Sequence, residues 1–140
     1  MARSYSILIA EDERILSAML AYNLEHCGYS VATADSAVPA LEILKSGHPV
    51  DLLLTDIQMP GEMDGQALAK RARKVRPEIA VIYMSGHYRV IKEIDAVPGA
   101  SLLPKPFVPS TARQEIERIL ARPQLPQRKW ISRVFFGMLH

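Results

Sequence analysis

Short apolar runs alternate along the first 120 residues with longer stretches of helical periodicity. The apolar runs are bounded by polar or turn-forming residues, which is typical of buried strands in a parallel sheet. They cover residues 5–10, 29–34, 51–55, 79–84 and 101–103. Helices are predicted over residues 13–27, from Asp35 or Ser36 to Gly47, over 65–75, within 88–95, and from Ser110 or Thr111 to about 121. This alternation requires right-handed crossovers and predicts a doubly wound α/β domain with a five-stranded parallel sheet and five helices.

Two of the predicted helices have informative side-chain patterns. The helix over 13–27 carries an apolar stripe at i, i+4 spacing that contains Ile15, Leu16, Met19, Leu20 and Leu24. Cys27, the single cysteine, lies at the end of this helix, and we expect a buried structural thiol there. The helix over 65–75 has a basic outer face, which we interpret as solvated surface.

The composition fits one globular domain, since 49% of the 140 residues are hydrophobic and 23% are charged. The N-terminus lacks the apolar segment of a signal peptide, and no apolar run reaches the roughly 18 residues of a membrane span, so a cytoplasmic protein is expected. Residues 122–140 contain four basic and no acidic residues, whereas residues 1–121 contain 13 Lys/Arg and 15 Asp/Glu. The globular part therefore gives no reason to expect nucleic-acid binding.

Polar side chains follow four of the predicted strands. They are Glu11 and Asp12 after the first strand, Asp56 after the third, Ser85 after the fourth and Lys105 after the fifth. Because parallel strands end at the same edge of a sheet, we expect these side chains to meet there. Three neighbouring carboxylates need raised pKa values or a cation, and oxygen ligands without Cys or paired His favour Mg²⁺. A carboxylate nucleophile, a metal ion, a lysine and a hydroxyl are the parts of a phosphoryl-transfer site.

Ordered sequence motifs make the chain resemble the receiver domain of bacterial two-component response regulators. The motifs are residues 7–12 (ILIAED), 54–61 (LTDIQMPG), 63–65 (MDG), 84–86 (MSG) and 103–107 (LPKPF). The resemblance spans about residues 5–121, so we assign 1–121 to a receiver domain and 122–140 to a tail. It implies a flavodoxin-like fold with strand order 2-1-3-4-5.

The resemblance also implies how the acidic residues act. Asp56 accepts a phosphoryl group from a phosphohistidine on a sensor histidine kinase or a histidine phosphotransfer protein. Asp12 and Asp56 bind Mg²⁺ directly, Glu11 acts through water, and Gln58 contributes its backbone carbonyl.

The remaining polar residues are implied to bind or tune the phosphoryl group. Lys105 and Ser85 bind its oxygens, and Gly86 adds an unhindered backbone N–H. The resemblance also implies a cis Lys105–Pro106 peptide bond. Gln58 and His87 flank the path of the water that hydrolyses the acyl phosphate, so they tune its lifetime; for His87 an ordinary exposed loop position is the alternative.

We therefore expect a single-domain response regulator that signals to a downstream protein by phosphorylation-dependent contact. It would not be an enzyme beyond its own phosphoryl uptake and autodephosphorylation. A phosphatase of the haloacid dehalogenase kind also uses a strand-end Asp and Mg²⁺, but it needs a second Asp where Gln58 stands. A degenerate receiver is disfavoured by the complete acidic set.

Leu102 departs from the family pattern. Most receivers carry Tyr or Phe three residues before the lysine, and that aromatic side chain swings inward on phosphorylation. Leucine has neither ring nor hydroxyl, so we expect the loop after Ser85 to be remodelled without a ring flip. Tyr83 and Tyr88 are candidates to replace the missing aromatic residue, and Tyr83 is predicted to belong to the core.

Residues 123–127 are predicted to form a linker. In the tail that follows, apolar residues repeat at i, i+4, and Arg128, Lys129 and Arg133 mostly occupy other positions. This pattern predicts a short amphipathic helix with a basic side. Several destinations stay open: packing on the domain or a second subunit in a homodimer, docking in a partner's groove, or lying on an anionic membrane surface. Disorder is a further alternative. DNA binding by these cations is disfavoured because no reading motif accompanies them.

Overall fold

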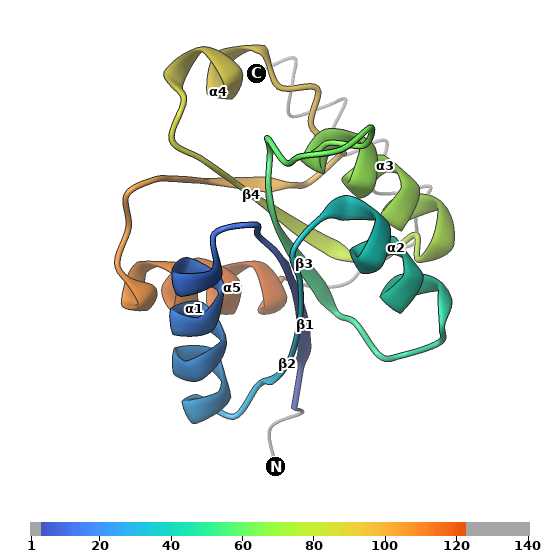
Figure 1. Ribbon diagram of the computed structural model, residues 1–140. Helices are drawn as coiled ribbons and strands as arrows, with labels where there is room; N and C mark the ends of the chain where they lie inside the picture. Colours follow the sequence, from blue (N-terminus) through green and yellow to red (C-terminus); the bar gives the residue numbers. More distant parts are fainter. Residues whose placement is uncertain (1–3, 123–140) are drawn as a thin grey trace.

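The computed structural model describes residues 4–122 and has five strands and five helices in strict alternation (Figure 1). The strands are β1 (Ser6–Ala10), β2 (Ser30–Ala34), β3 (Leu52–Asp56), β4 (Ala80–Ser85) and β5 (Ser101–Pro104). The helices are α1 (Arg14–His26), α2 (Ala37–Lys45), α3 (Gly65–Val75), α4 (Tyr88–Glu93) and α5 (Pro109–Leu120). All strand pairs are parallel and their order is β2-β1-β3-β4-β5, so the doubly wound fold and its strand order are confirmed.

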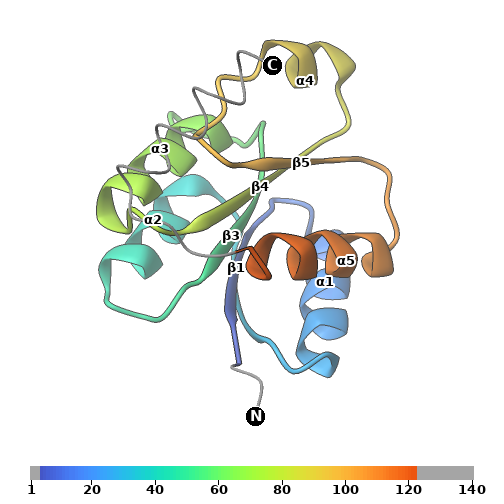
Figure 2. The ribbon, with the colours of Figure 1, turned by 180° about the vertical axis from the view of Figure 1, so that it is seen from behind.

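Both faces of the sheet are apolar and each is covered by a pair of helices (Figures 1 and 2). Successive side chains of a strand point to opposite faces, so Leu8 packs toward α2 and α3 while Ile7 packs toward α1 and α5. Each face has its own buried cluster, with Leu41, Leu44 and Leu68 in the first. Burial on both faces explains why the strands appear as continuous apolar runs in the sequence.

The register of the sheet aligns the carboxyl ends of the central strands. Residue pairs near this edge are Ala10–Thr55, Asp56–Met84 and Ser85–Pro104. The segments that follow β1, β3, β4 and β5 therefore emerge side by side, as expected from a parallel sheet.

The apolar stripe of α1 is wider than the face that the helix buries. Leu20 and Leu24 are fully buried, but 74% of Ile15 and 47% of Met19 is exposed. Helix α1 packs on the sheet and on α5, and the side chains of Ile15 and Met19 lie on its outer surface. The prediction of a buried Cys27 is wrong, because this residue is exposed where the chain leaves α1.

Two further differences concern ends of elements. Helix α5 begins at Pro109, with Val108 in the N-cap position, so the predicted capping by Ser110 or Thr111 is wrong. Proline is favoured at this first position because its φ is already helical and its missing N–H is not needed. The predicted tail helix lies outside the described residues. Within residues 4–122, no helix has the length and apolarity required to cross a bilayer.

Candidate functional site

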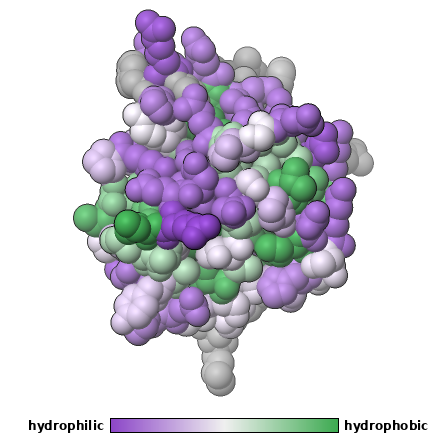
Figure 3. Space-filling model, viewed as in Figure 1, coloured by the Kyte–Doolittle hydropathy of each residue, from purple (hydrophilic) through white to green (hydrophobic). Residues whose placement is uncertain are grey.

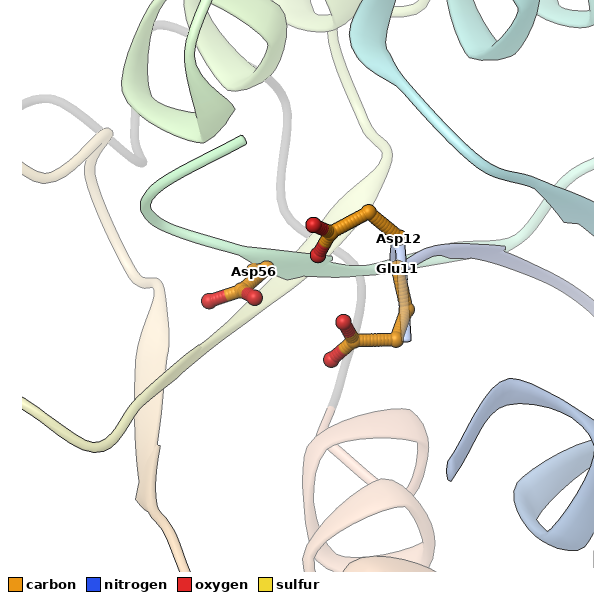
Figure 4. Close-up of side chains that lie close together, drawn as sticks. All are labelled: Glu11, Asp12 and Asp56. Carbon is orange, nitrogen blue, oxygen red and sulfur yellow. The ribbon is translucent and has the colours of Figure 1, made fainter. Parts of the chain in front are cut away.

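Three carboxyl groups converge at the carboxyl edge of the sheet (Figure 4). Asp56 is the last residue of β3, and Glu11 and Asp12 directly follow β1. One carboxylate oxygen from each lies within 4.8 Å of the others. Glu11 is buried and Asp12 is exposed, so the cluster extends from the protein interior to its surface.

Lys105 neutralises part of this acidic cluster. Its Nζ lies 2.6 Å from Glu11 Oε1 and 3.2 Å from Asp56 Oδ2. Its backbone N–H donates to the carbonyl of Ser85 at 2.8 Å, which ties the segment after β5 to the end of β4. The Lys105–Pro106 peptide bond is cis, as the resemblance implied.

Burial and charge shift the pKa values of the buried pair. Desolvation raises the pKa of Glu11, and the hydrogen bonds from Lys105 and the Glu13 N–H offset only part of this effect. Burial alone would lower the pKa of Lys105, but the hydrogen bond with Glu11 and the charge of Asp56 outweigh it, so this pKa is raised. Lys105 is therefore a fixed cation beside Asp56.

The donors already bound to Glu11 indicate which carboxylates are available to a metal ion. Glu11 Oε1 accepts from Lys105, and Oε2 accepts from the backbone N–H of Glu13 at 2.9 Å. The carboxylate of Asp12 is exposed and lies in the same cluster. A hard cation thus fits best between Asp12 and Asp56, with Glu11 in an outer position.

The backbone around Asp56 is held by the start of α3. Ile57 N–H donates to Met84 O at 2.9 Å, and Gly65 N–H donates to Ile57 O at 2.8 Å. Asp64 caps α3 by accepting from the Ala67 N–H at 2.9 Å. The sequence motif contained Asp64 and Gly65, but nothing in it showed that Gly65 lies against the backbone of Asp56.

The residues after β4 line the same edge. Ser85 is buried, and its Oγ accepts a hydrogen bond from the His87 N–H at 3.1 Å. Gly86 and His87 are exposed, and a Cβ added to Gly86 would lie 3.7 Å from Lys105 Cβ. Gln58, two residues after Asp56, is exposed as well. The structure thus connects Glu11, Asp12, Asp56 and Lys105 directly, and Ser85 through the Lys105 backbone.

Leu102 stands beside a buried tyrosine. It is half-buried and pairs in register with Tyr83 of β4, which is 1% exposed, so the prediction that Tyr83 belongs to the core is confirmed. Desolvation raises the pKa of Tyr83, which keeps its hydroxyl neutral. The side chain of Tyr88 lies outside what the structure describes.

Comparison with protein families matches residues 7–117 to the response regulator receiver domain. The chain belongs to this family. The response regulator receiver protein CpdR of Brucella abortus is 40% identical over 116 residues, which cover 81% of this chain and 95% of CpdR. The sensor kinase CckA of the same organism is 34% identical over 125 residues, which cover 84% of this chain but only 13% of CckA.

Solved structures agree with this assignment. A response regulator receiver protein from Sinorhizobium medicae WSM419 superposes with a TM-score of 0.78 at 32% identity, covering 84% of this chain and 95% of that one. The receiver match runs from β1 into α5 and includes all the residues of the candidate site. These residues are Glu11, Asp12, Asp56, Ser85 and Lys105, and we call them the acidic edge.

Proposed function

We propose that the chain acts as a response regulator whose phosphoryl acceptor is Asp56. The observation that carries this proposal is the placement of Asp56 at the end of a buried strand, 3.2 Å from Lys105 Nζ and next to Asp12 and Glu11. In the reaction, an Asp56 carboxylate oxygen attacks the phosphorus of a phosphohistidine, the P–N bond breaks, and the imidazole leaves. Water later attacks the phosphorus of the acyl phosphate, which releases inorganic phosphate and restores the Asp56 carboxylate.

Lys105 and Ser85 are proposed to bind the phosphoryl oxygens. Lys105 supplies a charge that its contact with Glu11 holds beside Asp56. Ser85 supplies a hydroxyl donor, and Gly86 keeps the adjacent backbone accessible. Gln58 and His87 are both exposed beside the site, which supports the proposal that they tune the access of water to the acyl phosphate.

Mg²⁺ is the cofactor that the donor set favours. Asp12 and Asp56 would bind it directly, and Gln58 would bind it through its backbone carbonyl. Glu11 would act through water, because both of its carboxylate oxygens already accept hydrogen bonds. When bound, the ion would neutralise the negative charge of the carboxylates and the transferring phosphoryl group. Without it, like-charge repulsion between Asp12, Asp56 and an incoming phosphate would oppose the reaction.

The domain is proposed to act as a stoichiometric phosphoacceptor rather than as an enzyme on external substrates. Its partners would be a sensor histidine kinase or a histidine phosphotransfer protein, and a downstream protein. The outer face of α1 supports contact with a protein donor, since it exposes Ile15, Met19 and Tyr22 on a helix that begins two residues after Asp12. Figure 3 shows apolar surface over α1 and α2, with strongly hydrophilic residues between them.

The decisive experiment is incubation with acetyl phosphate and MgCl₂, followed by intact-mass measurement. We expect one phosphoryl adduct in the wild type and none in Asp56→Asn. Asp35→Asn is the matched control, because Asp35 follows β2 as Asp56 ends β3 but does not join the carboxylate cluster. An adduct that persists in Asp56→Asn, or no adduct in the wild type, would refute the proposal.

A second variant separates docking from chemistry. Met19→Glu places a charge on the exposed face of α1 without touching the acidic site. It should slow transfer from a phosphorylated histidine phosphotransfer protein and leave uptake from acetyl phosphate unchanged. Equal slowing with both donors would argue against α1 as the docking surface.

A further inference from the structure

Two side chains of β4 hold the two ends of the segment 87–97, which contains α4. At the start of the segment, Ser85 Oγ accepts a hydrogen bond from the His87 N–H at 3.1 Å. At its end, the Tyr83 hydroxyl accepts one from the Val97 N–H, also at 3.1 Å. Both acceptors are only 1% exposed. Because they are two residues apart in a strand, they project from the same face of the sheet.

The Val97 end has more anchors than the His87 end. Asp95 N–H donates to Gln66 Oε1 of α3 at 2.8 Å, and Asp95 Oδ2 lies 2.6 Å from Lys70 Nζ. Val97 itself is buried in the same apolar cluster as Tyr83. The Lys70 contact is exposed and adds little, so the buried Tyr83–Val97 hydrogen bond and the Gln66 contact are the main attachments.

The His87 end depends on the residue that is proposed to bind the phosphoryl group. Among the described residues, Ser85 supplies the side-chain acceptor for the His87 N–H. For Ser85 to release the His87 N–H, its side chain must turn about χ1 as it donates to a phosphoryl oxygen, because that rotation carries the oxygen and its lone pairs away from His87. Helix α4 stands apart from the two helix pairs that cover the sheet (Figures 1 and 2), and among the described residues its main contact is with β4.

Leu102 and Tyr83 explain why the movement would start at α4 and not at β5. Leu102 packs against the cluster that contains Tyr83 and Val97, and its register partner is Tyr83. The aromatic ring on this face therefore belongs to β4, where burial and the hydrogen bond to Val97 fix it. Because its ring is fixed, Tyr83 cannot mark the phosphorylated state by changing its rotamer. It can instead hold the Val97 end of the segment while the His87 end moves.

We propose that Tyr83 is a positioning residue that keeps the Val97 end of the segment fixed, so that phosphoryl binding by Ser85 releases only the His87 end and turns α4 about Val97. The proposal rests on the phosphoacceptor function proposed for Asp56. Its consequence is a changed exposed surface on α4, presented to the downstream protein without any movement at Leu102.

Residue-resolved amide hydrogen exchange tests the anchor in the unmodified protein. Tyr83→Phe removes the hydroxyl and keeps the ring, so the Val97 amide should exchange roughly tenfold faster. Tyr22→Phe, on the exposed face of α1, is the matched control and should leave Val97 unchanged. Gln66→Ala should speed exchange at Asp95 while Val97 stays protected. Unchanged exchange at Val97 in Tyr83→Phe, or loss of its protection in Gln66→Ala, would overturn the role of Tyr83.

Addition of beryllofluoride and MgCl₂, which mimic the acyl phosphate, tests the turning of α4. In the wild type we expect faster exchange and shifted amide resonances from His87 to Ile94, with Val97 still protected. In Tyr83→Phe the change should extend through Val97. Equal loss of protection at both ends in the wild type would overturn the pivot. Failure of the wild type to bind beryllofluoride or accept a phosphoryl group would instead refute the proposed function and the switching step, while the exchange of Val97 still decides the anchor.

Discussion

Gly65, the first residue of α3, lies directly against the backbone of Asp56. A Cβ added to Gly65 would be 1.8 Å from the Asp56 carbonyl oxygen and 2.8 Å from its carbonyl carbon. The Gly65 N–H also donates to Ile57 O at 2.8 Å. The loop that leaves Asp56, the proposed phosphoryl acceptor, is thus closed by a glycine, and any side chain at this position must displace the backbone that carries Asp56.

Gly65→Ala is expected to destabilise the domain by roughly 1–3 kcal/mol or more, because the atoms that would have to move are backbone atoms. Phosphoryl uptake from acetyl phosphate should also fall, since the Asp56 carboxylate would shift relative to Lys105. Urea unfolding and intact-mass kinetics measure the two effects.

Gly86→Ala is the matched control for stability, because a Cβ there makes only an ordinary contact with Lys105 Cβ at 3.7 Å. Its free energy of unfolding should stay within about 0.5 kcal/mol of the wild type. Similar losses in both variants would show that close packing at Gly65 is not the cause.

Asp12→Asn should have opposite effects with and without Mg²⁺. Without the ion, removing one charge relieves repulsion with Asp56 and should stabilise the protein by up to about 1 kcal/mol. With Mg²⁺ at about 100 times the dissociation constant, the wild type should gain about 2.7 kcal/mol, and the variant should lose most of this gain. Thermal unfolding in EDTA and in MgCl₂ checks both signs, with Asp35→Asn as the control. Equal stabilisation of Asp12→Asn and wild type by Mg²⁺ would exclude Asp12 as a ligand.

Glu115 makes stability depend on pH at the junction of α5 and β5. It accepts hydrogen bonds from Arg118 and, at 3.0 Å, from Ser101 Oγ, and the Arg118 contact lowers the pKa of Glu115 below 4.5. Because the pKa of Glu115 is lower in the folded state than in the unfolded state, its ionised carboxylate stabilises the fold at pH values above 4.5, the pKa of the unfolded state. This stabilisation is lost as the pH falls through the pKa of the folded state.

Glu115→Gln should therefore be less stable than the wild type at pH 7, by less than about 1 kcal/mol for such a partly exposed pair. The difference should disappear at pH values below the lowered pKa. Urea unfolding between pH 3 and 7 measures it, and Glu42→Gln on the exposed face of α2 controls for net charge. A difference that does not vary with pH would contradict the assignment.

Arg76, at the end of α3, caps the end of the neighbouring helix α2. Its guanidinium donates to the carbonyl of Leu44 at 3.0 Å and to that of His48. The last carbonyls of a helix lack intrahelical partners, so loss of these donors leaves them unsatisfied. Arg76→Met should cost roughly 1–3 kcal/mol in unfolding free energy, whereas Arg71→Met on the exposed side of α3 should change it by less than about 0.5 kcal/mol. Equal costs would mean that the hydrogen bonds of Arg76 do not stabilise α2.

Interpretation of the basic face of α3 as solvated surface was only partly right. Lys74 and Arg71 are exposed, but Arg73 Nε donates to Ile79 O at 2.8 Å and Arg76 binds the end of α2. A run of basic residues identifies neither of these carbonyl acceptors, because both belong to segments that only the packed fold brings close.

The sequence alone was sufficient for the strands, their order along the chain and the acidic edge. Buried parallel strands need continuous apolar runs, and residues such as Asp56 and Lys105 follow those runs directly, so both can be recognised locally. The tertiary structure decided which apolar residues are buried, as Ile15 and Leu20 of one helix show. It also decided the contacts across the chain, including Lys105 with Glu11, Gly65 with Asp56 and Tyr83 with Val97. The physical reason is that a local sequence pattern determines whether a segment favours a helix or a strand and which of its faces is apolar. A contact such as Lys105–Glu11, between residues 94 positions apart, forms only after packing has fixed the distance between two segments.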